Sequence, residues 1–513
     1  MLVLISAISL AACTFYLARN VIFAGDRIPG PRRLPLLGNT LQLPKGHFWT
    51  WFERLYHEFG PIVSLNFAGD DYLLLSHPAD AEELLVKRSA IFSGRKQSVF
   101  GAKYRSNNKR MLLLPHGEDL KKQRSVFKLL LRPNALLSYH DRIEQQSSRL
   151  LLDLLEGPDR YRDHLYRFTA TLIMRITYGT GLHGQESDLD AILASNQSFN
   201  LDALPGAHLV DTFTWLDYLP DFLSPWRNDA KRKHLEELEL FQRLAVQVKE
   251  RRANGDDSES FMAQVWDCQT KYDLDEETVA YLGGSAFEAG TSVTACLLHT
   301  FLLACLTQPD VVRKAQAELD QVVGEDVPGF EHMSRLPYMH AVVKEALRWV
   351  PVTPLAFPHK CDVDQEYKGI KITAGTFIIP SIWNMHKDPR NFTDGQIFDP
   401  SRWYNPDANG NVKESDSLVD GHWTFGFGRR QCPANYLAVE VVWAAIAALL
   451  WAFDIRNSKD PVTGQPIEVD PTTTPWLDGV NIEPAPFPVS ILPRTKAHGE
   501  KIRLHWKAVA SSA

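Results

Sequence analysis

Hydrophobic and polar residues follow one another along the chain in a pattern that predicts a mainly helical protein with a minor β portion. Between residues 117 and 350, apolar positions recur every three or four residues, as in amphipathic helices, with a charged run at 229–252 and an apolar run at 277–307. Residues 61–76 predict two strands around a Gly-Asp-Asp turn, and short strands are expected again at 366–380 around a Tyr-Lys-Gly turn. The expected order is a small β-rich start, a helical body and a mixed carboxyl-terminal third.

The amino terminus carries a hydrophobic segment long enough to enter a membrane. Residues 2–18 are apolar apart from Ser and Thr, and a helix of this length spans about 26 Å. No positive charge precedes the segment, as a cleaved signal peptide would require, whereas arginines follow it at 19, 27, 32 and 33. We expect residues 1–24 to form a single-pass transmembrane anchor with its carboxyl side in the cytosol. A lipoprotein cleavage site at 10–13 is the alternative, and it lacks the charged start that such a signal needs.

A proline-rich stretch follows this segment. Residues 25–45 include Ile28-Pro-Gly-Pro31 and Pro35-Leu-Leu-Gly38, and because prolines fix the backbone they stiffen a linker. We therefore expect a hinge here. Beyond it the sequence has no repeat and no low-complexity linker, so residues 46–513 are expected to form a single catalytic domain.

Charge and cysteine usage exclude two further classes of protein. A net charge of −7 and a pI near 6.2 give no reason to expect a nucleic-acid partner. The six cysteines are widely scattered without paired spacing, which argues against a disulfide framework and for a reducing compartment.

The strongest chemical signal is a cysteine loop near the carboxyl end, Phe425-Gly-Phe-Gly428-Arg-Arg430-Gln-Cys432-Pro. The apolar residues 436–453 that follow predict a buried helix, and Pro433 suits its first position. A thiolate at a helix amino terminus is stabilised by unpaired amides and by the helix dipole. Such a thiolate can serve as the axial ligand of a haem iron. The alternative is an inert buried cysteine beside a turn.

The spacing Phe-x-x-Gly-x-Arg-x-Cys in this loop resembles the haem-ligand signature of the cytochrome P450 family. The resemblance covers roughly residues 28–495 and implies the mainly α P450 fold, preceded here by the expected transmembrane helix. It implies haem b (iron protoporphyrin IX) as cofactor, with Cys432 as the axial iron ligand. Phe425 and Gly428 of the loop would then contact the cofactor, and Arg430 would neutralise a haem propionate.

Two further segments resemble family elements that support the cofactor. Glu345-Ala-Leu-Arg348 and, about fifty residues later, Arg402 match the family's Glu-Arg-Arg triad, which implies that these side chains brace the cysteine loop. Arg124 matches a propionate-binding position, although Leu120 stands where a tryptophan is usual, and His359 corresponds to a position that often supplies another cation or donor.

The oxygen side of the site departs from the family pattern. Phe287-Glu-Ala-Gly290-Thr-Ser-Val-Thr294 aligns with the distal motif Ala-Gly-x-Asp/Glu-Thr-Thr. Ala289 and Gly290 match, and their small size implies access for dioxygen and substrate. Ser292 replaces the usual acid and Val293 the first threonine, so that only Thr294 of the pair remains to help deliver protons. Either Thr294, Ser292, a water or a substrate hydroxyl supplies protons to a monooxygenase, or the site performs atypical haem-thiolate chemistry such as coupling, rearrangement or dehydration.

The expected function is that of a membrane-anchored haem-thiolate monooxygenase resembling fungal microsomal members of secondary metabolism. The aromatic, turn-rich segment 204–220 resembles their substrate-access lid. The resemblance implies a lipophilic substrate, dioxygen, electrons from NADPH–cytochrome P450 reductase with cytochrome b5 as an optional second donor, and an endoplasmic reticulum location with a cytosolic catalytic domain. Lys121, Lys122 and Arg429 are candidates for a basic patch facing the electron donor. A haem-binding sensor without turnover is the non-enzyme alternative.

Overall fold

The computed structural model describes residues 28–179, 186–204, 206–256 and 258–512. Contacts between Cα atoms divide the chain into two units, of which unit 1 comprises residues 1–96, 355–385 and 427–430 and unit 2 comprises the remaining residues. The expected anchor, residues 1–24, lies outside the described residues, and the described part of the expected hinge begins at Ile28. The expectation of a single catalytic domain stays a prediction.

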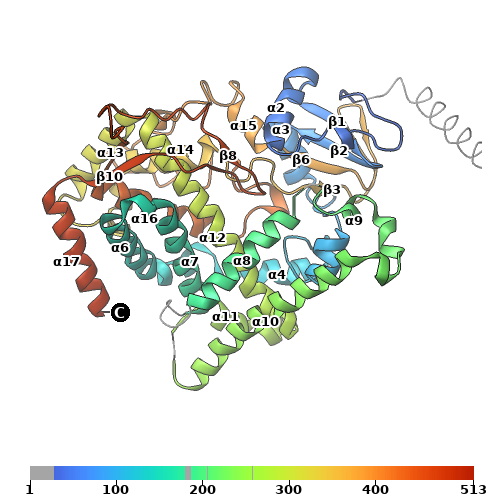
Figure 1. Ribbon diagram of the computed structural model, residues 1–513, viewed down its shortest axis with the longest axis horizontal. Coiled ribbons are helices and arrows are strands. Elements are labelled where there is room, and N and C mark those ends of the chain that lie inside the picture. Colours follow the sequence, from blue (N-terminus) through green and yellow to red (C-terminus); the bar gives the residue numbers. More distant parts are fainter. Residues whose placement is uncertain (1–27, 180–185, 205, 257, 513) are drawn as a thin grey trace, which may run out of the picture. The chain divides into compact units, whose positions relative to one another are not determined.

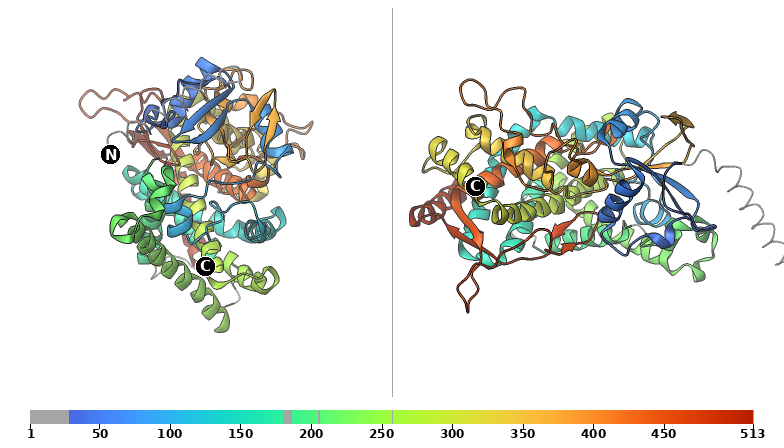
Figure 2. Two further views of the ribbon diagram at one scale, coloured as in Figure 1. Left: turned by 90° about the vertical axis from the view of Figure 1, so that its right-hand side faces the viewer. Right: turned by 90° about the horizontal axis from the view of Figure 1, so that it is seen from above.

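Unit 1 contains most of the β structure. Its main sheet has the order β1-β2-β6-β3, with β1 and β2 antiparallel, β2 and β6 parallel, and β6 and β3 antiparallel (Figure 2). Helix α2 covers the sheet with Trp51, Phe52 and Leu55, which pack against Val63 and Phe377. The regular elements of unit 1 are α2 (Phe48–Phe59), β1 (Ile62–Phe67), β2 (Asp70–Leu75), α3 (Pro78–Ala81), β3 (His359–Lys360), the hairpin β4 (Gln365–Tyr367) and β5 (Ile370–Ile372), β6 (Phe377–Pro380) and the start of α15 (Ile382–Lys387).

Unit 2 is the helical body. Its helices are α4 (Glu118–Leu130), α5 (Pro133–Leu136), α6 (His140–Glu156), α7 (Tyr161–Tyr178), α8 (Glu186–Asp202), α9 (Leu209–Thr212), α10 (Pro225–Ala253), α11 (Phe261–Tyr272), α12 (Glu276–Thr307), α13 (Pro309–Val322), α14 (Pro337–Trp349), α16 (Asn435–Ala452) and α17 (Lys496–Ser512). Two short antiparallel pairs accompany them, β7 (Phe453–Asn457) with β10 (Val489–Pro493) and β8 (Trp476–Leu477) with β9 (Glu483–Pro484).

The central helix of unit 2 is α12, which packs against α7, α8, α10, α11, α14 and α16 (Figure 1). The carboxylate of Asp275 caps its first turn by accepting from Thr278 N at 2.7 Å, and Pro309 follows its end. Because α12 is apolar on nearly every side, it is stable only when surrounded by other helices.

Two described helices, α12 and α16, are long and apolar enough to cross a membrane. In each, 78% of the most apolar window is buried inside the protein, as expected for core helices. The apolar runs at 277–307 and 436–453 therefore form the interior of unit 2. The strands expected at 61–76 and 366–380 are present as β1–β2 and β4–β6, which confirms the mainly helical fold with a minor β portion.

Candidate active site

The cysteine loop closes on itself within unit 2. Cys432 N donates to Phe425 O at 2.9 Å, and Gly426 N donates to Trp423 O at the start of the turn. Gly426 has φ +74°, a left-handed conformation that favours glycine. Helix α16 begins at Asn435, so the expectation that Pro433 occupies its first position is wrong. Pro433 and Ala434 form a turn instead, and the Ala434 N–H is directed to the Cys432 sulfur.

The surroundings of Cys432 exert opposing effects on its thiol. Burial raises the pKa of Cys432, while the Ala434 N–H and the nearby charge of Arg124 lower it. Arg124, on α4, donates through Nη2 to Gln431 O at 2.8 Å, directly beside the cysteine. The structure thus brings Arg124 to the cysteine loop, where its positive charge favours a thiolate. As a residue Cys432 is half-buried, whereas three other cysteines are buried, namely Cys296, Cys305 and Cys361.

The donor set fits a haem iron. Among the described residues there is no group of three or more His, Cys, Asp and Glu side chains that could hold a metal ion. A metal bound by Cys432 would therefore need most of its ligands from a group other than the protein, as a porphyrin provides. Cys432, a half-buried residue, could supply one axial ligand through its sulfur.

The tip of the loop belongs to unit 1 and requires glycine. Gly428 has φ +54°, and a Cβ built there would lie 2.0 Å from Leu85 O, which is far inside van der Waals contact. Arg430 donates through Nε to Ser93 O at 2.8 Å. The glycine that the resemblance placed at this position is thus explained by a close backbone approach.

Basic side chains gather near Arg430 within unit 1. His359 is buried and donates from Nδ1 to Phe92 O at 2.8 Å. Burial and the charges of Arg95 and Arg430 hold the pKa of His359 well below its usual range, so its ring is neutral. Arg95, itself buried, donates to Phe357 O at 2.7 Å and Pro358 O at 2.8 Å.

Arg95 and Arg430 place two positive charges beside the neutral imidazole of His359, and this local positive charge favours a nearby anion. This arrangement fits the carboxylates of haem, with the positive charge on Arg95 and Arg430 and with His359 as a neutral neighbour. The sequence reasoning missed Arg95, since a single arginine in a polar segment carries no pattern that separates it from a surface residue.

Glu345, Arg348 and Arg402 lie together within unit 2. Glu345 and Arg348 are fully buried on α14, and Glu345 accepts from Arg348 Nε and Nη2 at 2.8 and 2.7 Å. Arg402 Nε and Trp403 Nε1 donate to the same carboxylate at 3.1 and 2.8 Å. At the end of α14, Thr424 Oγ1 donates to Leu347 O at 2.8 Å, which connects the cluster to the start of the cysteine loop.

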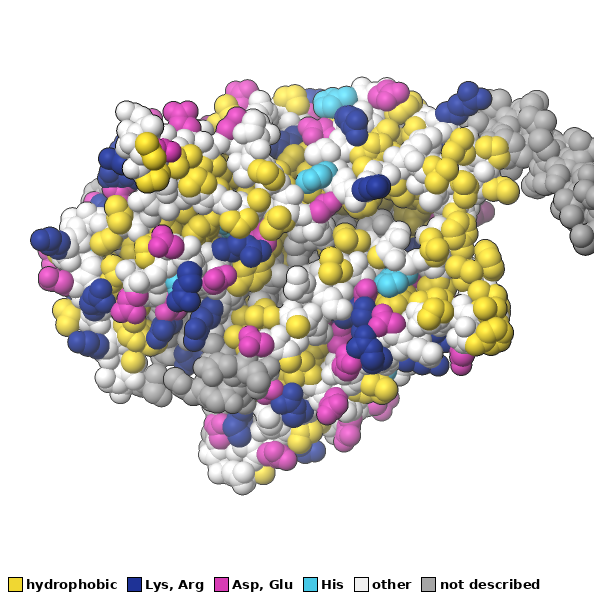
Figure 3. Space-filling view, viewed as in Figure 1, with side chains coloured by type: hydrophobic (Ala, Val, Ile, Leu, Met, Phe, Trp, Pro, Cys, Tyr) yellow, Lys and Arg dark blue, Asp and Glu magenta, His cyan; other side chains and the backbone are white. Residues whose placement is uncertain are grey.

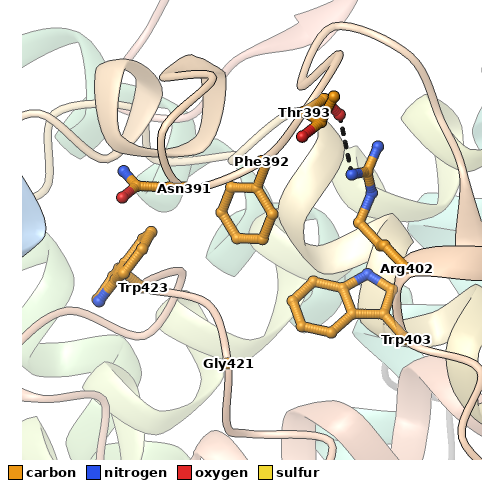
Figure 4. A pocket seen from close by; sticks show the side chains of 7 residues that line it. All are labelled: Asn391, Phe392, Thr393, Arg402, Trp403, Gly421 and Trp423. Carbon is orange, nitrogen blue, oxygen red and sulfur yellow. Dashed lines mark hydrogen bonds between the residues drawn. The ribbon is translucent and has the colours of Figure 1, made fainter.

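A hollow of about 610 Å³ adjoins this cluster. Figure 4 shows Arg402 and Trp403 at one side of it and Trp423 at the other, with Phe392 between them. Arg402 donates to Thr393 O at 3.1 Å, the dashed bond in the figure. The residues that line the hollow include Arg402 and Trp403, which bind Glu345, and include no residue of α12. The hollow therefore belongs to the surroundings of the Glu345 cluster.

The distal motif lies on α12 and forms a break in the burial of that helix. Ala289 is exposed and Ala286, Gly290 and Val293 are half-buried, although the residues on either side of this stretch are buried. These four positions share the i, i+3, i+4, i+7 spacing of one helix face. We call them the small-residue face; a flat apolar ligand can approach the backbone closely there.

The individual distal residues have different surroundings. A Cβ at Gly290 would lie 2.9 Å from Ile173 Cδ1 of α7, so this glycine also serves helix packing. Thr294 is buried. Leu120, where the family usually has tryptophan, is buried in the core of unit 2.

Ser292 has partners that the sequence did not reveal. Its Oγ accepts from Asn481 Nδ2 at 3.2 Å and lies 3.5 Å from Asn196 Nδ2. Asn481 also accepts from Thr353 Oγ1 at 3.0 Å. The two asparagines are far from the distal motif in the chain, so no local pattern could have identified them.

Comparison with known proteins agrees with this geometry. A sequence model described as "Cytochrome P450" matches residues 28–469. The cytochrome P450 monooxygenase fogE of Aspergillus ruber is 31% identical over 94% of this chain and 90% of its own. Cytochrome P450 monooxygenase 58 of Postia placenta is 34% identical over 92% of this chain and 89% of its own. The cytochrome P450 monooxygenase virE of Hypocrea virens is 31% identical over 94% of this chain and 88% of its own.

The family match covers the cysteine loop, the buried Glu345 cluster and the small-residue face of α12 together. Relatives above 30% identity extend over nearly the whole chain. The chain therefore belongs to the cytochrome P450 family of haem-thiolate monooxygenases.

Proposed function

We propose that this protein is a membrane-anchored monooxygenase that inserts one oxygen atom into a lipophilic small molecule, an intermediate of secondary metabolism. The overall reaction is R–H + O2 + NADPH + H⁺ → R–OH + H2O + NADP⁺, with the electrons passing through NADPH–cytochrome P450 reductase. Bound haem would supply the redox centre at which dioxygen is activated. The proposed location is the endoplasmic reticulum membrane, with the catalytic domain in the cytosol.

The observation that carries the catalytic part is the placement of Cys432. It is half-buried on a loop closed by its own backbone bond to Phe425, beside the charge of Arg124. Arg430, His359 and Arg124 are proposed neighbours of the propionates, as in the sequence expectation, and Arg95 joins them. On α12, the exposed Ala289 is proposed to face the substrate.

The carbon monoxide difference spectrum of the reduced protein tests the ligand. We expect the band of a thiolate-ligated haem in the wild type and its loss in Cys432→Ser. Cys268→Ser is the matched control, since Cys268 is also half-buried but lies on α11. A Soret band typical of histidine-ligated haem in the wild type would contradict the assignment.

Exposed hydrophobic side chains support a membrane-facing surface. Figure 3 shows hydrophobic side chains gathered over the part of unit 2 that carries α9 and the turns after it. Trp215, Tyr218 and Phe222 are 60%, 92% and 82% exposed there, in and just after the segment expected to form the access lid. A contiguous apolar surface of this kind is typical of a site that meets a membrane or another protein.

Membrane attachment and substrate class have separate tests. Deletion of residues 1–24 should release most of the protein from the membrane fraction. In the truncated protein, Trp215→Ser combined with Phe222→Ser should then reduce the fraction that stays bound. If the truncated protein stays fully bound after both substitutions, this surface is not a membrane contact. Comparison of the metabolites of a deletion strain with those of its parent would identify the substrate.

The electron donor needs its own experiment. Lys121 and Lys122, candidates for a basic patch, are paired with Glu118 and Asp273, which reduces their net charge toward a partner. Reconstitution with NADPH–cytochrome P450 reductase, with and without cytochrome b5, should give an oxygenated product. Product formed without reductase or NADPH would favour the atypical rearrangement or dehydration chemistry, and haem binding without any turnover would favour a sensor.

A further inference from the structure

A row of polar side chains runs along α12, with two serines next to the small-residue face and Glu288 further round the helix. Ser285, Glu288 and Ser292 are spaced i, i+3 and i+7, which places them on one side of the helix. We call these three residues the polar edge. Glu288 and Ser292 lie within the distal motif itself, and Glu288 is a buried ionisable group there.

Two oxygens of the polar edge are buried without a protein partner among the described residues, Glu288 Oε1 and Ser285 Oγ. Glu288 is only 7% exposed, and its other oxygen, Oε2, accepts from Arg110. Buried polar atoms of native proteins are nearly always hydrogen-bonded, and where protein groups are missing an internal water takes their place. Two orphaned oxygens one helical turn apart thus indicate a hydrated site along this edge.

Ser292 is held so that its proton can point away from its own helix. A helical serine usually donates to the carbonyl four residues earlier, which here is that of Glu288. That carbonyl instead accepts from Asn196 Nδ2 at 3.1 Å, a bond that also fixes which end of the Asn196 amide carries the hydrogens. Since Asn481 donates to Ser292 Oγ at 3.2 Å, the serine oxygen is an acceptor there, and its hydrogen remains available for a further partner.

The ion pairs around Glu288 allow it to become neutral. Arg110 is bound by two carboxylates, Glu288 Oε2 and Glu237 Oε2, the latter at 2.9 Å. If Glu288 takes up a proton, Arg110 keeps Glu237 as a counter-charge and no buried charge is left alone. Glu237 belongs to α10 and also binds Arg105, so it lies between two guanidinium groups.

Burial and the charged groups of neighbouring elements together set the pKa of Glu288. Burial raises the pKa of Glu288 to about 7, with Glu237 acting in the same direction and Arg110 and Arg105 opposing it. Tyr281 of α12 and Tyr178 of α7 are the other titratable groups nearby, and burial raises the pKa of both phenols, so they stay neutral.

We propose that Glu288 is the proton reservoir of the distal face, supplying protons through an internal water and the Ser292 hydroxyl in place of the family's acid–alcohol pair. The proposal rests on the proposed monooxygenase function. Reduction of dioxygen with insertion consumes two electrons and two protons: R–H + O2 + 2e⁻ + 2H⁺ → R–OH + H2O. The electrons come from NADPH, each proton leaves the Glu288 carboxyl group by way of Ser292, and the carboxylate is reprotonated from solvent water.

The decisive variant is Glu288→Gln, which keeps an oxygen for Arg110 but cannot titrate. We expect the yield of oxygenated product per NADPH to fall roughly tenfold or more, toward the usual contribution of a general acid, while NADPH oxidation continues and hydrogen peroxide is released. In the wild type this yield should fall as pH rises through about 7, because Glu288 loses its proton there; in Glu288→Gln it should not change with pH. Glu288→Asp should retain the pH dependence.

Glu440→Gln is the matched control, because burial also raises the pKa of Glu440 to about 7, but on α16. This variant should keep the wild-type yield and its pH dependence. Ser292→Ala should lower the yield in the same way as Glu288→Gln. A wild-type yield and pH profile in Glu288→Gln would overturn the proposal.

Infrared spectroscopy provides a readout that does not depend on turnover. The carbonyl absorption of a protonated carboxyl group should titrate near neutral pH in the wild type, lose one component in Glu288→Gln and keep that component in Ser292→Ala. Absence of the Glu288 component from the wild-type spectrum would refute the reservoir, whether or not the enzyme makes product. Absence of product from a wild type that shows this component would instead refute the proposed monooxygenase function.

Discussion

Removal of the Glu345 carboxylate should destabilise unit 2 strongly, because that group is the buried partner of Arg348. Glu345 accepts five hydrogen bonds, from Arg348 (twice), Arg402, Trp403 and the Asp399 backbone N–H. In Glu345→Ala, the Arg348 guanidinium keeps only the carbonyl groups of His386, Gly395 and Ile397 as partners. A buried positive charge is then left without a carboxylate.

The magnitude follows from weighing two contributions. Five hydrogen bonds to a charged group, at about 1.5–3 kcal/mol each, would sum to roughly 7–15 kcal/mol. That sum is too large, since the variant also avoids the cost of burying the carboxylate, which is fully shielded from water. Breaking one partner of a buried pair costs about 3–5 kcal/mol, and this is the loss we expect in the free energy of unfolding.

Urea unfolding followed by far-ultraviolet circular dichroism measures this loss, and Asp310→Ala serves as control. Asp310 pairs with Arg313 at the same three-residue spacing, but both side chains are exposed, so its removal should cost about 1 kcal/mol or less. Glu345→Ala should also weaken haem retention, because Thr424 connects the end of α14 to the cysteine loop. The reasoning is refuted if the two variants unfold at the same urea concentration.

Three further variants test the cysteine loop, the distal motif and a buried carboxyl group of α16. Gly428→Ala should lower stability and haem content more than Gly410→Ala, since both positions have positive φ but only at Gly428 would the new Cβ collide, with Leu85 O; equal effects in thermal unfolding would contradict this. Val293→Thr restores the family's usual alcohol and should keep or raise the yield of product per NADPH, whereas less product with more peroxide would favour the atypical chemistry. Burial raises the pKa of Glu440 to about 7 in the folded protein. Its contribution to the free energy of unfolding is therefore present below the pKa of the unfolded state and is lost as pH rises through about 7. Glu440→Gln should flatten the pH dependence of the melting temperature, and an unchanged profile would show that Glu440 does not titrate there.

Predictions that rest on residues a few positions apart in the sequence were confirmed more often than predictions that depend on how distant residues pack. The apolar run at 277–307 became α12, because periodicity within one helix is set by residues a few positions apart. The start of α16 was misplaced because Pro433 satisfies the rule for a first helical position, yet the turn that directs the Ala434 N–H to the sulfur delays the helix to Asn435. His359 was expected as a cation or donor, and burial beside two arginines leaves its ring neutral.

Spacing within one segment is enough to identify the cysteine loop, the Glu345–Arg348 pair and the small residues of the distal motif. The groups that surround them become known only from the folded arrangement of the helices. Asn196 and Asn481 reach Ser292 from α8 and from the β8–β9 connection, and Glu288 shares Arg110 with Glu237 of α10. Such contacts join residues far apart in the chain, and the burial that shifts their pKa values exists only after the helices have packed.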